Sequence, residues 1–168
     1  MNAMQNVYLI KEFIEKAYHT ETRIFEREKA AVFRCSCTLP VVLKGKVLAS
    51  FEVSILARDT FIDAILYIES GIEEKKRRNA GEYLQRVNYP MDNGSFDFNI
   101  EKGDVLYRQS TYVEGIQPSE LILEHLLETS LFYAYRYHLP LQKLLADELN
   151  AEEAYELGIK RSLEDDIV

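Results

Sequence analysis

The chain has 168 residues, of which 47% are hydrophobic and 11% aromatic, so it can bury a core of its own and favours one domain. Its 28 acidic residues outnumber its 20 basic ones, and the net charge of -8 disfavours binding to nucleic acid or to an anionic membrane. Charged residues interrupt the apolar pattern of residues 1–18, and no later run approaches the roughly 20 apolar residues of a membrane-spanning helix. We therefore expect a cytoplasmic protein that does not bind membranes.

The first half of the chain predicts one helix followed by three strands. Apolar residues recur at helical spacing over residues 4–18. Apolar and polar residues then alternate over residues 31–39 and 46–57, which is the two-residue period of a half-buried strand. Residues 60–70 are rich in β-branched and aromatic side chains and predict a third strand, but one that is apolar on both sides.

The second half predicts two longer helices. Helical spacing returns over residues 72–88, and residues 119–138 carry a leucine-rich stripe at the same spacing. We expect Pro140 to interrupt the second of these helices, because proline lacks the amide donor that a helix interior needs. A short helix is then predicted over residues 141–149.

The C-terminal region predicts one further helix. Asn150 and Glu153 have the spacing of a capping box at its start, and we expect Gly158 to end it. The sequence after it is acidic. The chain therefore divides into a single α+β domain at residues 1–150 and a C-terminal helix with an acidic tail at residues 151–168.

The stretch MDNGSFDFNIEKGDVLYRQ, residues 91–109, can be interpreted as a calcium loop or as a hairpin. Phe96 and Phe98 occupy positions where a calcium loop needs oxygen ligands. The alternation of apolar and polar residues, followed by a turn at Gly103, favours a hairpin. The expected cross-strand pairs are Ile100 with Val105, Phe98 with Tyr107, and Asp97 with Arg108.

The predicted order is helix, three strands, helix, hairpin and long helix, followed by extra C-terminal helices. It predicts an α+β fold with a five-stranded, mainly antiparallel sheet. This order, with the stretch around residues 83–115, resembles the YbjN family, whose members are described as bacterial sensory transduction regulators. The matching positions are Asn88, Gly94, Phe96, Gly103, Val105, Tyr107, Arg108 and Gly115.

The resemblance covers roughly residues 5–150 and rests on hairpin and packing positions. It implies a fold like that of the type III secretion chaperones. It also implies a small, often dimeric, non-enzymatic protein that acts as a chaperone or regulatory adaptor for another polypeptide. The apolar segment at residues 46–68 departs from what the family leads us to expect, which leaves the outer face of the sheet open to interpretation.

The sequence offers no catalytic or metal-binding constellation. Cys35 and Cys37 lack the further ligands of a zinc site, are too few for a disulfide framework, and are predicted to be small buried side chains. His125 and Glu128 are spaced to share a metal on a helix, but a di-iron bundle needs carboxylates from four helices. No nucleophile elbow or phosphate-binding loop is present. We predict a protein that is not an enzyme and has no cofactor.

The basic run at residues 73–78 has the sequence EEKKRR. Glu73 and Glu74 precede Arg77 and Arg78 by four residues, the spacing of ion pairs on an exposed helix. A solvated helix face is therefore predicted in preference to a phosphate-binding patch.

The candidate site lies on the third predicted strand. If its core side is formed by alternate residues from Ile62 onward, then Phe61, Ile65 and Tyr67 point the other way and would be exposed in a monomer. We predict that these three residues contact a second copy of the chain, as in a homodimer, or a protein client. The alternative is that the segment after Pro140 folds back and covers them.

A different function would use the eleven tyrosines of the chain. A small-molecule sensor or enzyme could have a pocket between the sheet and the long helix, lined by Tyr83, Tyr107, Tyr133 or Tyr137, because each tyrosine offers an apolar ring and a hydroxyl. A filled core would remove this alternative.

Overall fold

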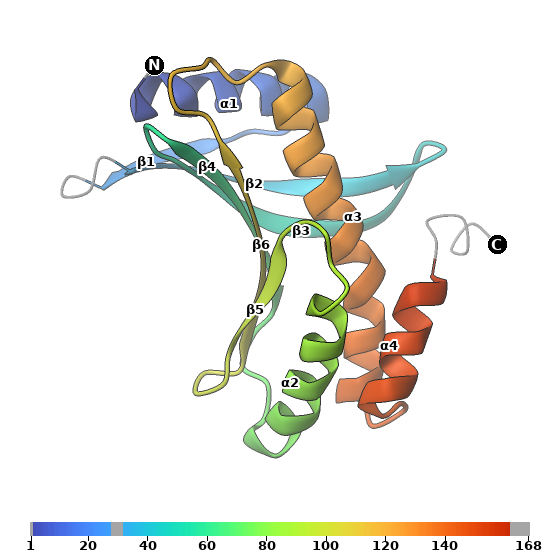
Figure 1. Ribbon diagram of the computed structural model, residues 1–168. Helices are drawn as coiled ribbons and strands as arrows, with labels where there is room; N and C mark the ends of the chain where they lie inside the picture. Colours follow the sequence, from blue (N-terminus) through green and yellow to red (C-terminus); the bar gives the residue numbers. More distant parts are fainter. Residues whose placement is uncertain (1, 28–31, 162–168) are drawn as a thin grey trace.

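A computed structural model describes residues 2–27 and 32–161 of the chain, so the predicted acidic tail at residues 162–168 lies outside the described residues. The fold is α+β, with one antiparallel sheet and four helices (Figure 1). Each described helix is too short or too polar to cross a lipid bilayer. The elements in chain order are α1 (Ala3–Tyr18), β1 (Arg23–Arg27), β2 (Val32–Leu43), β3 (Lys46–Ala57), β4 (Phe61–Glu69), α2 (Glu74–Asn88), β5 (Ser95–Asn99), β6 (Asp104–Tyr112), α3 (Glu120–Leu145) and α4 (Ala151–Lys160).

The sheet has six strands in the order β1-β2-β3-β4-β6-β5, so the prediction of five strands was wrong. The missed strand is β1, which pairs antiparallel with β2 at the edge of the sheet. It spans five residues and includes Arg23, Glu26 and Arg27. Its sequence, RIFER, is short, sets Ile24 beside Phe25 and is otherwise charged, as is common for edge strands, so it shows no apolar–polar alternation. The sequence pattern therefore did not reveal it.

All four helices lie on one side of the sheet. α1 packs on β2 and β3, α3 crosses β2, β4 and β6, and α2 packs on β5 (Figure 1). α4 contacts α2 and α3 instead of the sheet. The core lies between this helical layer and the sheet face that carries Phe51, Leu66 and Tyr107. Within residues 2–27 and 32–161, no helix covers the opposite face of the sheet.

α3 continues through Pro140 to Leu145, so the predicted interruption was wrong. Pro140 is buried, and Tyr137, Leu141 and Leu144 on either side of it belong to the core. Burial of a large apolar side chain stabilises by about 1.5–3 kcal/mol, so several such contacts outweigh the backbone hydrogen bond that the proline removes.

α4 begins where the sequence predicts. Asn150 and Glu153 form the predicted capping box, in which the Asn150 side chain accepts from the Glu153 amide and the Glu153 side chain accepts from the Asn150 amide. Gly158, however, lies within α4 and does not end it. It is buried, and a Cβ atom there would lie 2.6 Å from the Tyr137 ring. Gly158 is therefore a packing residue, because it lets α4 approach α3.

The β5–β6 hairpin forms, but the predicted register was wrong by two residues. Phe98 pairs with Val105 and Phe96 with Tyr107, while Ile100 lies exposed in the turn. The Asn99 side chain accepts two backbone hydrogen bonds within this turn, which lengthens it. Asp97 and Arg108 still share one face of the sheet. They are diagonal neighbours on that face, and the Arg108 Nε lies 2.8 Å from the Asp97 Oδ2 in an ion pair.

The run at the start of α2 is partly solvated as predicted, with Glu73, Glu74, Lys75 and Arg78 exposed. The expected pairs four residues apart are not among the described ion pairs, and Lys76 and Arg77 bond to neighbouring elements instead. Lys76 donates to the Leu145 carbonyl at the end of α3 and pairs with Asp147. Arg77 donates to the carbonyls of Ile72, Ile100 and Glu101. These cations join the start of α2 to the end of α3 and to the turn of the hairpin.

Candidate binding surface

The sheet face opposite the helices is the candidate site, and we call it the open face. Successive side chains along a strand alternate between the two faces, so the strand register assigns its members. They include Arg23, Phe25, Arg34, Ser36, Thr38, Glu52, Ser54, Leu56, Phe61, Asp63, Ile65, Tyr67, Asp97, Leu106, Arg108, Ser110 and Tyr112.

All three predicted site residues lie on the open face, but they differ in exposure. Phe61 is 41% exposed and Tyr67 is 42% exposed, whereas Ile65 is only 7% exposed. Ile65 lies between Ser54 on β3 and Arg108 on β6, which screen it. α4 packs on the helical side of the sheet, so this helix does not cover the row.

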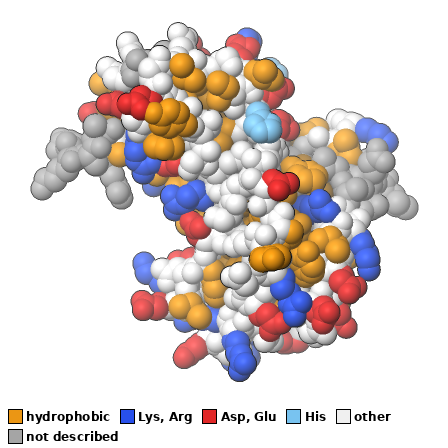
Figure 2. Space-filling model, viewed as in Figure 1, with side chains coloured by type: hydrophobic (Ala, Val, Ile, Leu, Met, Phe, Trp, Pro, Cys, Tyr) orange, Lys and Arg blue, Asp and Glu red, His pale blue; other side chains and the backbone are white. Residues whose placement is uncertain are grey.

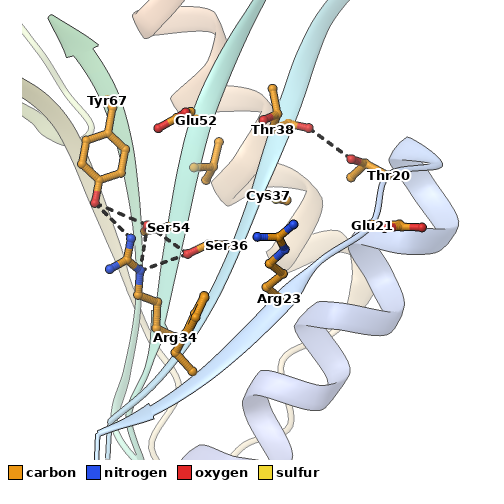
Figure 3. Close-up of a pocket in the computed structure, with 12 residues that line it drawn as sticks. Thr20, Glu21, Arg23, Arg34, Ser36, Cys37, Thr38, Glu52, Ser54 and Tyr67 are labelled. Atoms are coloured by element: carbon orange, nitrogen blue, oxygen red, sulfur yellow. Dashed lines mark hydrogen bonds between the residues drawn. The ribbon is translucent and has the colours of Figure 1, made fainter.

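Side chains of β2, β3 and β4 form a polar network on the open face, centred on Arg34 (Figure 3). The Arg34 Nε donates to the hydroxyls of Ser36 and Ser54, both at 3.0 Å. Its Nη2 donates to the Tyr67 hydroxyl at 3.3 Å. Ser36 is the cross-strand partner of Arg23, so both guanidinium groups reach the same part of the surface.

A cavity of about 530 Å³ surrounds this network, and we call it the arginine cavity. Polar and aromatic side chains from β1, β2, β3 and β4 and from the loop before β1 line it. They include Thr20, Glu21, Arg23, Phe25, Arg34, Ser36, Thr38, Glu52, Ser54 and Tyr67. Its volume lies within the range of roughly 300–1,000 Å³ that is usual for ligand-binding sites.

A second cavity, of about 690 Å³, continues the first along the open face. Glu52 and Tyr67 line both cavities, and the Asp97–Arg108 ion pair lies in the second. Tyr67 therefore stands between two hollows. A segment laid across β2, β3, β4 and β6 would contact it on either side.

A second charged cluster lies near Phe61. Asp63 is buried, accepts a hydrogen bond of 2.6 Å from the Ser110 hydroxyl and forms an ion pair with Arg58. The Phe61 ring packs edge-on against Tyr112, with 5.2 Å between centroids. The open face thus places exposed aromatic rings beside fixed charges.

The cysteines and histidines show no reactive site among the described residues. Burial raises the pKa of both thiols, that of Cys37 to about 12, which leaves them protonated near neutral pH. Burial lowers the pKa of His138, whose ring packs edge-on against Phe51. Within residues 2–27 and 32–161, no three His, Cys, Asp or Glu side chains lie together as a metal would require.

The four tyrosines of the alternative pocket pack as part of the core. The Tyr83 hydroxyl donates to the Tyr137 carbonyl, and the Tyr107 hydroxyl donates to the Asn93 carbonyl, each at 2.8 Å. The Tyr133 ring stacks with Tyr107 on one side and Tyr137 on the other. Neither open-face cavity is lined by any of these rings. Their packing weighs against a tyrosine-lined pocket.

Sequence reasoning missed the arginine cavity. Arg34, Ser36 and Ser54 were present in the alternating pattern, but they were interpreted only as the solvent side of two strands. Arg23 lies on the strand that was not predicted. Two arginines on one face of the chain's first strands, with small hydroxyl residues between them, were the available signal.

The surface shows no concentration of basic side chains in the view of Figure 2, where Lys and Arg are dispersed among Asp and Glu.

Comparison of the chain with protein-family models, with curated proteins and with solved structures found no significant match.

Proposed function

We propose that this chain is a non-catalytic protein that binds a segment of another polypeptide on the open face of its sheet. One observation carries the proposal: all described helices lie on one side of the sheet, and the other side exposes aromatic residues and arginines. Aromatic residues and arginine are enriched in protein interfaces, where they supply most of the binding free energy.

The chemistry of the open face fits a polypeptide better than a nucleic acid. Its exposed rings, Phe25, Phe61 and Tyr67, alternate with ion pairs such as Asp97–Arg108. Burying one such ring contributes about 1.5–3 kcal/mol. Nucleic acid needs a continuous basic surface, whereas this chain has a net charge of -8.

The resemblance to the YbjN family and to type III secretion chaperones supports the same function. With it we propose a cytoplasmic protein that acts as a chaperone or regulatory adaptor for a client polypeptide. The client is the occupant that we propose for the open face. A second copy of the chain, as in a homodimer, is the other candidate and would compete for the same rings.

Site-specific photo-crosslinking in the native cell tests this proposal. A benzophenone amino acid in place of Phe61 or Tyr67 should capture a client protein, identified by mass spectrometry. Tyr89 is the matched control, because it is also aromatic and is 87% exposed, but it follows α2 and lies off the open face. Adducts of another protein at both open-face positions and not at Tyr89 are expected. Adducts with a second copy alone would indicate a homodimer, and equal capture at all three positions would refute a specific surface.

Binding measurements with the captured client give a second test. Phe61→Ser and Tyr67→Ser should each weaken binding about tenfold or more, because each removes a ring that the client buries. Ile65→Asp is a poor test, because Ile65 is buried and the new carboxylate would destabilise the fold itself.

A further inference from the structure

The arginines of the open face fall into two classes. Arg58 forms an ion pair with Asp63, and Arg108 forms one with Asp97. Among the described residues, neither Arg23 nor Arg34 forms an ion pair. Both of these arginines, for which the described residues supply no carboxylate partner, line the arginine cavity.

Arg34 is held in place by neutral groups. Ser36, Ser54 and Tyr67 accept its hydrogen bonds, which fix the orientation of the guanidinium without neutralising its charge. A guanidinium has five N–H donors, so further donors stay available to a ligand. Holding the side chain in advance lowers the conformational entropy that binding costs.

Arg23 lines the same cavity from the neighbouring strand, opposite Ser36. Figure 3 shows Ser36 between the two guanidinium groups, with Arg34 on one side and Arg23 on the other. Two guanidinium groups beside small hydroxyl residues match the oxygens of a carboxylate or a phosphate. The cavity therefore offers the hydrogen-bond donors that an oxyanion would need.

The rest of the cavity favours a single negative charge. Glu21 and Glu52 also line it, and Figure 3 shows Glu21 pointing away from both arginines. These carboxylates would repel a phosphate dianion about twice as strongly as a carboxylate. Phe25, which is 52% exposed, and Tyr67 supply rings for the apolar groups on either side of the bound anion.

We infer that the arginine cavity binds a carboxylate of the client, either an Asp or Glu side chain or the C-terminal carboxylate, and so selects acidic segments. This inference rests on the proposed function and names the chemistry that the open face selects. The proposed site is positively charged, although the chain as a whole has a net charge of -8.

Peptide selection tests the inference without knowledge of the client. Two random peptide libraries, one with a blocked C-terminus and one with a free C-terminus, are selected on the wild-type protein and on the double variant Arg23→Gln/Arg34→Gln. The matched control, Lys75→Gln/Arg86→Gln, removes the same charge from α2 on the helical side. The wild type and the control should enrich an acidic residue, or a free C-terminus, and the double variant should not.

Affinities of one selected peptide then complete a mutant cycle. Replacing its Glu by Gln, or amidating its C-terminus, should weaken binding to the wild type about tenfold or more and leave binding to the double variant unchanged. Arg23→Gln alone provides a variant that spares the fold, because Arg23 donates no side-chain hydrogen bond to the described residues. It should reduce the same preference.

The outcomes separate this inference from the proposed function. If no peptide is selected on any protein, the proposed function fails. If peptides bind through Phe61 and Tyr67 without an acidic preference, the proposed function stands and the carboxylate site is refuted. If inorganic phosphate displaces a selected peptide better than acetate does at equal ionic strength, the site is a phosphate site and the inference is overturned.

Discussion

Replacing Gly158 by alanine should destabilise the protein, although alanine is the better helix former. Gly158 lies within α4, where alanine would gain about 1 kcal/mol of helix propensity. Its Cβ atom, however, would lie 2.6 and 2.8 Å from two atoms of the Tyr137 ring. This ring cannot move away easily, because it is buried, stacks with Tyr133 and packs edge-on against Phe96. Overpacking of this kind costs about 1–3 kcal/mol. At the upper end of that range, the net loss is about 2 kcal/mol.

Gly81 is the matched control on α2. A Cβ atom there would meet the Phe98 ring at 3.6 Å, an ordinary van der Waals distance. Gly81→Ala therefore makes the same chemical change in a helix without a clash. It should stabilise the protein by about 1 kcal/mol, the full difference in helix propensity.

Thermal and urea unfolding of the two variants measure the difference. The free energies of unfolding should differ by about 3 kcal/mol, which corresponds to about 6–12 °C in Tm for a chain of this size. Equal stabilisation by both substitutions would refute the reasoning, because it would mean that α4 does not pack against the Tyr137 ring as described.

Three further predictions concern buried and half-buried polar groups. Burial raises the pKa of the Cys35 and Cys37 thiols, and Cys35 is buried whereas Cys37 is half-buried, so iodoacetamide at pH 7 should modify Cys35 only at the rate of unfolding and Cys37 more slowly than a free cysteine; rapid modification of Cys35 in native buffer would contradict this. The Asn88 side chain donates to and accepts from the backbone of β5, so Asn88→Ala should lower the free energy of unfolding by about 1–3 kcal/mol, while Asn79→Ala on the exposed side of α2 should change it little. Burial lowers the folded pKa of His138, so the unfolded state binds more protons below its own pKa of about 6.5. The free energy of unfolding should therefore decrease as pH falls from 6.5 toward the folded pKa, and the same curve in His138→Gln would contradict the assignment.

Local patterns predicted those elements whose cause is local. Apolar and polar residues alternate over residues 49–55, and β3 spans Lys46–Ala57 as predicted. The capping box of Asn150 and Glu153 depends on a spacing of three residues, and it forms. The register of the β5–β6 hairpin was missed because it depends on the Asn99 side chain, which accepts two hydrogen bonds and shifts the turn.

Elements that depend on distant residues escaped the sequence patterns. Pro140 stays helical because Tyr137 and Leu141 are buried against segments far away in the chain. The two-residue period of β4, in contrast, was enough to predict that Phe61 and Tyr67 lie on the face opposite the core, since successive side chains of a strand point to opposite faces. The arginine cavity, by contrast, exists only once β1 pairs with β2 and sets Arg23 opposite Ser36.

The negative net charge of this chain predicts that it repels an acidic segment, whereas the two arginines of the cavity predict that it binds one. Which effect dominates depends on the distance between the charges. At physiological ionic strength, charges separated by more than about 8 Å are largely screened, so the net charge of -8 acts weakly on a group already inside the arginine cavity. There the guanidinium groups of Arg23 and Arg34 act at hydrogen-bond distance, where geometry and the loss of water determine the binding free energy. The excess of carboxylates elsewhere repels an acidic segment as it approaches, but has little effect on the segment once it is bound in the cavity. The negative net charge repels an acidic segment at long range and so does not speed its association. The arginine cavity would therefore select a carboxylate by slowing its dissociation.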